Sequence, residues 1–125
     1  MKQGNGETIL LVDDDEAQRK LGKSILTTLG YKTETAESGE KALDFLRERT
    51  FDLVLLDMVM EPGMDGLDTY QNILTIQPDQ KVIIVSGYSE TDRIKKALEL
   101  GVRSYVKKPY RLGEIVTAIQ EVLAG

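Results

Sequence analysis

The sequence predicts an α/β fold, a single domain built on a parallel sheet with helices on both faces. Short apolar runs alternate five times with segments whose apolar residues recur at helical spacing. Strands that alternate with helices of about ten to fifteen residues are typical of βαβ units, in which the strands are parallel. Because the crossovers between such strands are right-handed, few topologies remain open. Residues 53–56 and 82–85 are apolar throughout, as expected of strands that are covered on both faces.

The first half of the chain is predicted to contain two strand–helix units and the third strand. A strand at residues 8–12 precedes a helix that Gly30 ends, and residues 31–36 show the polar alternation of a short edge strand. Ser38 is expected to cap the second helix, and the third strand covers residues 52–57. Two sets of apolar residues define the two helices: Ala17, Leu21, Ile25 and Leu29, then Ala42, Leu43, Phe45 and Leu46.

The second half continues the alternation. A loop at residues 60–66, rich in helix breakers, precedes a helix at about residues 67–76, and Pro78 ends that helix. A fourth strand covers residues 82–85, and a fifth strand ends at Lys108. The fourth helix is bounded by an N-cap, Ser89 or Thr91, and by Gly101 just past its end. The apolar positions of the last two helices are Ile94, Ala97, Leu98 and Leu100, then Leu112, Ile115, Val116, Ile119, Val122 and Leu123.

Composition narrows the class of protein. The chain has 125 residues, enough for one domain, which we place at residues 8–125, after a linker or start at residues 1–7. It contains no cysteine and no histidine, which excludes a Ser/His/Asp triad and a thiolate or histidine zinc site and suits a cytoplasmic location. A net charge of −5 argues against a nucleic-acid partner. No apolar run approaches the ~20 residues of a membrane span, so we expect no membrane contact.

Chemically distinctive side chains stand where four of the strands end. Asp13 and Asp14 follow the first strand, and Asp57 closes the third. Ser86 follows the fourth strand, and Lys108 ends the fifth. Because the carboxyl ends of parallel strands share one edge of a sheet, we expect these groups to converge on one crevice.

Three carboxylates in one crevice predict a metal ion. Asp13, Asp14 and Asp57 would repel one another unless a cation lay between them. Oxygen ligands suit Mg²⁺, which commonly takes one or two carboxylates and keeps several waters. Each residue also has an ordinary structural explanation. Asp13 and Asp14 could be acids at a helix N-terminus, and Asp57 could cap a loop. Ser86 could be a turn residue, and Lys108 a solvated surface lysine. Their coincidence at four strand ends favours the functional interpretation.

Asp57 is the natural centre of such a crevice. A carboxylate can attack phosphorus and form an aspartyl phosphate. Phosphoryl transfer depends on positioning and on neutralising charge, which calls for a metal, a cation and a hydroxyl or amide donor. The acidic pair, Lys108 and Ser86 supply these groups.

Four segments of the chain resemble the receiver domain of two-component response regulators: residues 9–14, 53–57, 85–87 and 105–109. The resemblance spans nearly the whole chain and implies a flavodoxin-like (βα)5 doubly wound parallel sheet with strand order 2-1-3-4-5. It implies Asp57 as the phosphoacceptor, and Mg²⁺ held by Asp13, Asp14, Asp57 and the backbone carbonyl of Val59. 

The resemblance also assigns the remaining positions. Ser86 and Lys108 match the hydroxyl and the lysine of the active site, and Tyr105 matches an aromatic switch residue. The bond between Lys108 and Pro109 is then expected to be cis. One departure is the loop proline, Pro62, which comes one position later than usual, so that Glu61 looks inserted.

The function implied is phosphorelay signalling. The domain would accept a phosphoryl group from a histidine kinase or a histidine phosphotransfer domain and catalyse its own phosphorylation and dephosphorylation, without being a turnover enzyme. Phosphorylation would switch the surface formed by the fourth helix, the fifth strand and the fifth helix, which is also a candidate homodimer contact. The lead-in resembles the linker of a hybrid sensor kinase, and a free-standing regulator is the alternative.

Two other classes compete with this interpretation. A degenerate receiver that binds partners without phosphorylation would be expected to lack the acceptor, the acidic pair or the lysine. A Mg²⁺-dependent phosphatase would place a general acid at position 59, where this chain has Val59. Val59 and Tyr88 are expected to flank the approach of water to the phosphoryl group, and because neither orients water well, they predict a long-lived aspartyl phosphate.

Overall fold

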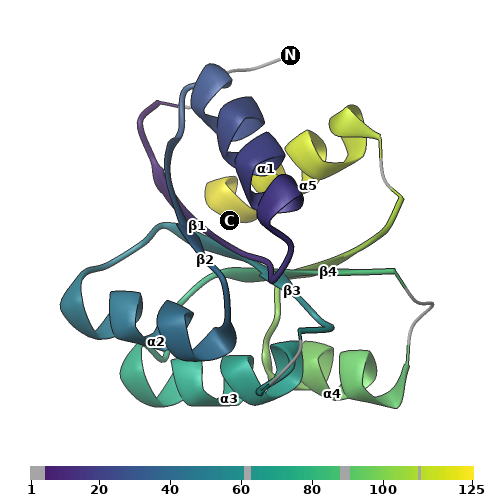
Figure 1. The fold of residues 1–125 in the computed structure, drawn as a ribbon. Helices are drawn as coiled ribbons and strands as arrows, with labels where there is room; N and C mark the ends of the chain where they lie inside the picture. The colour runs from purple at the N-terminus through teal and green to yellow at the C-terminus, as the bar shows by residue number, and fades with distance from the viewer. Residues whose placement is uncertain (1–4, 61–62, 88–90, 110) are drawn as a thin grey trace.

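The computed structural model describes residues 5–60, 63–87, 91–109 and 111–125, where five strands alternate with five helices (Figure 1). Their bounds are β1 (Thr8–Val12), α1 (Glu16–Thr28), β2 (Lys32–Ala36), α2 (Gly39–Glu48), β3 (Leu53–Asp57), α3 (Gly66–Ile76), β4 (Val82–Ser86), α4 (Asp92–Leu100), β5 (Ser104–Lys107) and α5 (Leu112–Ala124). Every predicted element is present. Some residues that entered the sequence predictions lie outside the described ranges: residues 1–4 of the predicted linker, Glu61, Pro62, Tyr88 and Ser89.

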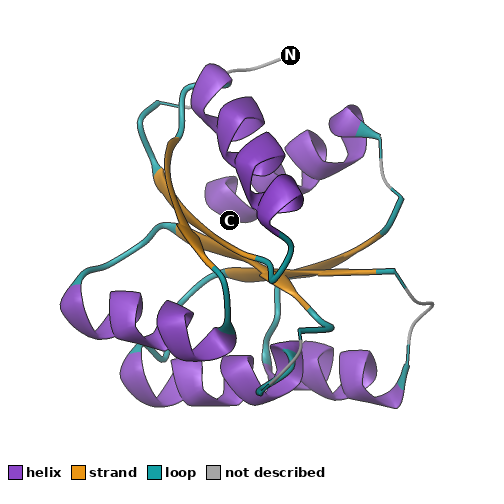
Figure 2. Ribbon diagram, in the orientation of Figure 1, coloured by secondary structure: helices purple, strands orange, loops and turns teal. Residues whose placement is uncertain are grey.

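The five strands form one parallel sheet in the order β2-β1-β3-β4-β5. Helices α1 and α5 cover one face, and α2, α3 and α4 cover the other (Figure 2). This is the flavodoxin-like arrangement and strand order that the family resemblance implied, with β2 at an edge. Asp57 pairs with Val85, and Ser86 pairs with Lys107, so these strands end side by side.

The sheet divides the core into two layers, and successive residues of β3 contribute to opposite layers. Leu53 and Leu55 pack in the layer under α1 and α5, whereas Val54 and Leu56 pack in the layer under α2, α3 and α4. All four are buried, as the apolar run predicted. The same alternation in β4 directs Val85 and Ser86 toward opposite faces.

The helix ends follow the capping signals in the sequence. Ser38 accepts a hydrogen bond from the backbone N–H of Lys41 at 3.1 Å and caps α2, as predicted. Thr91 accepts from the backbone N–H of Ile94 at 3.2 Å and is the N-cap of α4. Gly101, with a φ of 119°, ends α4 in the left-handed conformation that glycine adopts without strain.

The inner face of α1 is not the one that apolar spacing predicts. Leu21 is 57% exposed, and Leu26 is the residue of α1 that is buried. Gly22 turns toward the sheet, where a Cβ would lie 2.5 Å from Cδ2 of Leu11. Helix α1 therefore contacts the sheet at a glycine. The spacing of apolar residues cannot predict such a contact.

The last strand also differs from the prediction, since β5 ends at Lys107 rather than Lys108. The backbone N–H of Lys108 still donates to the carbonyl of Ser86 at 2.7 Å. Pro109 follows and has no N–H with which to continue the ladder. The peptide bond between Lys108 and Pro109 is cis, as the resemblance implied.

Candidate functional site

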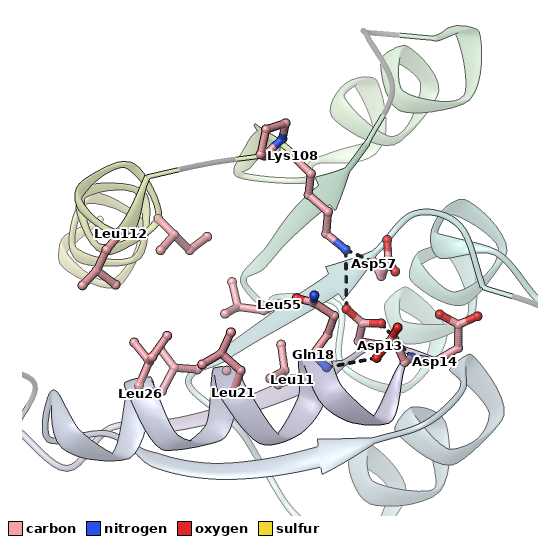
Figure 3. A pocket seen from close by; sticks show the side chains of 15 residues that line it. Leu11, Asp13, Asp14, Gln18, Leu21, Leu26, Leu55, Asp57, Lys108 and Leu112 are labelled. Carbon is pink, nitrogen blue, oxygen red and sulfur yellow. Dashed lines mark hydrogen bonds and ion pairs between the residues drawn. The ribbon is translucent and has the colours of Figure 1, made fainter.

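Three carboxylates meet at the carboxyl edge of the sheet. Asp57 is the last residue of β3, and Asp13 and Asp14 lie in the turn between β1 and α1. Asp13 is buried and Asp14 is exposed, yet one carboxylate oxygen from each of the three lies within 4.8 Å of the others (Figure 3). The predicted acidic cluster is thus assembled.

Lys108 reaches the cluster from the end of β5. Its Nζ lies 3.5 Å from Oδ2 of Asp13 and 3.6 Å from Oδ2 of Asp57 (Figure 3). The side chain of Lys108 is 30% exposed, and those of Asp13 and Asp57 are 10% and 11% exposed, so these charges are shielded from water. Lys107 is an exposed residue. The lysine that sequence reasoning chose is the one that pairs with the acids.

Backbone and side-chain donors hold Asp13 in place. The backbone N–H of Asp15 donates to Oδ1 of Asp13 at 2.9 Å. Nη1 of Arg19, from the first turns of α1, donates to the backbone carbonyl of Asp13 at 2.7 Å. Arg19 was not predicted from the sequence, because its spacing carries no signal and the contact depends on how α1 packs.

The environment of Asp57 disfavours its charged form. Burial raises the pKa of this carboxyl, and the neighbouring Asp13 and Asp14 raise it further. Lys108 and the backbone N–H of Val59 act in the opposite direction, and the resulting pKa is about 6. The positive charge of Lys108 is therefore insufficient to offset burial and two acids, and a further cation at the cluster would stabilise it.

The oxygen donors suit a hard divalent cation. Carboxylates within 4.8 Å of one another can share an ion, and Mg²⁺ and Ca²⁺ prefer such ligands. The residues present thus fit the metal that sequence reasoning expected.

Ser86 and Tyr105 lie on the other side of the sheet from the carboxylates. Ser86 is fully buried at the end of β4 and lines a hollow of about 710 Å³ beside the first turns of α3 and α4. Tyr105 is partly buried against the core layer under α2, α3 and α4. Val59, whose backbone carbonyl is the fourth predicted metal ligand, exposes 43% of its surface. Tyr88, predicted to flank the phosphoryl group, lies outside the described residues.

An open groove of about 640 Å³ runs from the acidic cluster between α1 and α5 (Figure 3). Its walls include Leu21 and Leu112, which expose 57% and 45% of their surfaces. Both residues were predicted to lie on apolar helix faces, and their exposure beside the carboxylates was not predicted.

The family model for the response regulator receiver domain matches residues 9–120 of this chain. The chain is a response regulator receiver domain. It therefore belongs to the two-component phosphorelay systems, and its pocket of Asp13, Asp14 and Asp57 fits a phosphoacceptor site.

Curated relatives agree with this assignment. The receiver domain is 38% identical over 117 residues to sporulation initiation phosphotransferase F of Bacillus subtilis, covering 94% of each chain. It is 30% identical over 118 residues to chemotaxis protein CheY of Thermotoga maritima, covering 94% of this chain and 98% of the relative. It spans 27% of the transcriptional regulatory protein ZraR of Klebsiella oxytoca, at 36% identity over 97% of this chain.

Solved structures show the same fold. A CheY-like receiver domain protein from Methanospirillum hungatei superposes with a TM-score of 0.90 at 30% identity, covering 95% of this chain and 94% of that one. The response regulator TrrA from Thermotoga maritima, solved in complex with Mg²⁺ and BeF, gives a TM-score of 0.82 at 34% identity, covering 93% and 98%. None of the helices in the described ranges has the length and apolar character that a membrane crossing requires.

Proposed function

We propose that the domain, residues 8–125, accepts a phosphoryl group on Asp57 from a histidine kinase or a histidine phosphotransfer domain. The observation that carries this proposal is the placement of Lys108, whose Nζ lies 3.6 Å from Asp57 and 3.5 Å from Asp13. The ammonium group of Lys108 thus pairs with the proposed acceptor and with one member of the acidic pair. A degenerate receiver has no need to bury charges in this way.

The chemistry follows from the ionisation of Asp57. With a pKa of about 6, the carboxyl is mainly ionised at neutral pH and can act as a nucleophile. An oxygen of Asp57 forms the new bond to phosphorus as the bond from phosphorus to the donor's histidine nitrogen breaks and that nitrogen takes up a proton. Lys108 would then neutralise charge on the phosphoryl oxygens, so the domain contributes to catalysis of its own phosphorylation.

The acidic cluster would hold Mg²⁺ through Asp13, Asp14 and Asp57, together with the backbone carbonyl of Val59. The bound ion would neutralise charge on the acids and on the incoming phosphoryl group. Two observations support this set of ligands. The three carboxylates lie together, and the backbone N–H of Val59 donates a hydrogen bond to Asp57, so the backbone of Val59 lies beside the cluster.

Phosphorylation would switch the surface formed by α4, β5 and α5, through Ser86 and Tyr105. A phosphoryl group at Asp57 would draw in the hydroxyl of Ser86 and leave space for Tyr105. Both residues lie on the α4 side of the sheet, which supports a shared movement. The changed surface would bind a partner or a second copy of the chain.

The lifetime of the phosphoryl group would depend on Val59 and Tyr88. The exposed side chain of Val59 supports this proposal, because it offers no group that could orient an attacking water. We therefore expect slow dephosphorylation.

Phosphorylation by a small donor tests the proposed function. Incubation with acetyl phosphate and Mg²⁺, followed by intact mass measurement, should show one added phosphoryl group. Lys108→Gln should slow the reaction by about two orders of magnitude, because it removes a preorganised cation. Lys107→Gln is the matched control and should react as wild type. A wild-type protein that takes up no phosphoryl group would contradict the proposal, and equal rates for both variants would exclude Lys108 from the chemistry.

A further inference from the structure

Arg93, in the first turn of α4, is bound to the N-terminus of α3 by three charged hydrogen bonds. Its Nε lies 2.6 Å from Oδ2 of Asp65, and its Nη2 lies 2.9 Å from Oδ1 of Asp65 and 3.0 Å from Oδ1 of Asp68. We call these three residues the Arg93 clamp. A single ion pair at a surface contributes little to folding stability. The contribution becomes significant when a guanidinium binds one carboxylate through two hydrogen bonds and also binds a second carboxylate.

Asp65, on the carboxylate side of the Arg93 clamp, is fixed by a hydrogen bond from the backbone, unlike a freely solvated surface acid. Asp65 is the N-cap of α3 and accepts from the backbone N–H of Asp68 at 2.9 Å. Burial raises the pKa of Asp65, but the hydrogen bonds and charge of Arg93, together with the bonds from Asp68, hold that pKa below its ordinary value. The pair is therefore ionised over the whole neutral range.

The start of α3 sits directly on the backbone beside the proposed acceptor. The N–H of Gly66 donates to the carbonyl of Met58 at 2.7 Å. A Cβ at Gly66 would lie 2.8 Å from Cα of Met58 and 2.9 Å from the carbonyl oxygen of Asp57. Asp65 is thus held at a fixed position relative to Asp57.

The Arg93 side of the clamp belongs to a less firmly packed helix. Buried residues of α4 are Ile94 and Ala97, whereas α5 buries five: Ile115, Val116, Ala118, Ile119 and Val122. Helices α3 and α4 lie side by side on the same face of the sheet (Figure 1). The first turn of α4 is therefore held by the buried side chain of Ile94 and by the Arg93 clamp.

Ser86 stands on the same side of the sheet as the Arg93 clamp. The hollow that Ser86 lines is also lined by Asp65, Asp68 and Arg93, whereas Asp57 lines the groove toward α1 and α5. Because neighbouring residues of a strand point to opposite faces, Ser86 at the end of β4 is directed away from that groove. Reaching a phosphoryl group on Asp57 requires the end of β4 to shift toward it, away from the hollow that the Arg93 clamp lines.

We propose that the Arg93 clamp is a latch that holds the first turn of α4 in the unphosphorylated arrangement and opposes the movement of Ser86 toward Asp57. This inference rests on the proposed function at Asp57. Arg93 is a positioning residue that acts through Ser86, not a group that touches the phosphoryl. Since coupling between two sites is reciprocal, weakening the clamp should tighten binding of a phosphoryl mimic at Asp57.

Titration of the full chain with beryllofluoride in the presence of Mg²⁺, followed by NMR chemical shifts, tests the proposal. Arg93→Gln and Asp65→Asn each remove one side of the clamp, and asparagine keeps the N-cap of α3. Each should bind beryllofluoride about three to five times more tightly than wild type. The double variant should match either single variant, because the two changes remove the same interaction. Arg93→Lys, which keeps the charge without the planar fork, should fall between wild type and Arg93→Gln.

Arg47→Gln is the matched control, because Arg47 forms an exposed ion pair with Asp44 within α2 at 3.1 Å, away from the clamp. It should bind beryllofluoride as wild type does. A wild-type affinity for Arg93→Gln, a weaker one, or effects that add in the double variant would each overturn the latch while leaving Asp57 as the acceptor. A wild-type protein that does not bind beryllofluoride would overturn the proposed function, and the latch with it.

Discussion

At the scale of single residues, the proposed acceptor is a carboxylate held where its charge is disfavoured. Burial and the two neighbouring acids raise the pKa of Asp57 to about 6, despite Lys108. The folded domain is therefore destabilised by the ionised form of this residue. Such a cost is typical of a functional site, since a stable fold alone would not place three acids together.

The raised pKa predicts how stability depends on pH. The folded state holds the Asp57 proton up to a pH of about 6, whereas the unfolded state loses it near 3.8, so wild-type stability should fall as pH rises between these values. Asp57→Asn removes the ionisation. It should be more stable than wild type at pH 7.5, by up to about 3 kcal/mol, and by much less at pH 4.

Urea unfolding at several pH values measures this difference. Asp44→Asn, which changes an exposed acid of α2, is the control and should not show the same dependence. An advantage of Asp57→Asn that is equal at both pH values would show that the wild-type carboxyl is not destabilised by its charge.

At the scale of elements, close backbone contacts fix the strand ends that form the site. The N-terminus of α3 contacts the backbone at Met58 and Asp57 through Gly66, and α1 rests on the sheet through Gly22. The contact at Gly66 depends on the missing side chain because a Cβ there would meet backbone atoms, whereas a Cβ at Gly22 would meet the end of the Leu11 side chain. Neither glycine has a positive φ, so their role is space rather than backbone freedom.

Gly66→Ala should destabilise the domain by about 1–3 kcal/mol, because the new Cβ meets backbone atoms at 2.8 and 2.9 Å that cannot rotate away. Gly113→Ala in α5 is the matched control, since nothing lies within 4 Å of its Cβ position. It should be neutral or stabilising by about 0.5–1 kcal/mol, through helix propensity. Denaturant unfolding of both variants measures the contrast, and equal stabilities would contradict the packing at Gly66.

At the scale of the whole molecule, the alternation of strands and helices was enough to predict the sheet, its parallel strands and the edge at which the site forms. Asp13, Asp14, Asp57 and Lys108 were found from the ends of apolar runs because a parallel sheet aligns those ends. The positions of the strand ends can be predicted because the periodicity of apolar residues is a local property of the sequence.

Contacts between distant helices could not be predicted in this way. The exposure of Leu21, the bond from Arg19 to Asp13 and the clamp at Arg93 all depend on how each helix is rotated on the sheet. In α1 a glycine, Gly22, faces the sheet, and a pattern of apolar residues does not include glycine. Long polar side chains also reach several positions, so their partners follow only from the packed structure.

Binding of Mg²⁺ should stabilise the entire domain, because it relieves repulsion in a cluster that exists only when the sheet is folded. At a hundred times the dissociation constant, a ligand that binds the folded state alone adds about 2.7 kcal/mol. The melting temperature of wild type should rise with Mg²⁺, and Asp14→Asn should remove most of the rise. Asp15→Asn is the control: this neighbouring acid is the N-cap of α1, a role that asparagine also fills. If Asp14→Asn responds as wild type does, the metal binds elsewhere.

Asp57 is the proposed carrier of the phosphoryl group, and this proposal is tested by locating the group in the chain. The protein is incubated with acetyl phosphate and Mg²⁺, reduced with borohydride, which converts an aspartyl phosphate to homoserine, and digested for peptide mass mapping. We expect homoserine at position 57 in wild type and none at any position in Asp57→Asn. Homoserine at Asp13, Asp14 or another acid of the wild-type chain, with Asp57 unchanged, would contradict it.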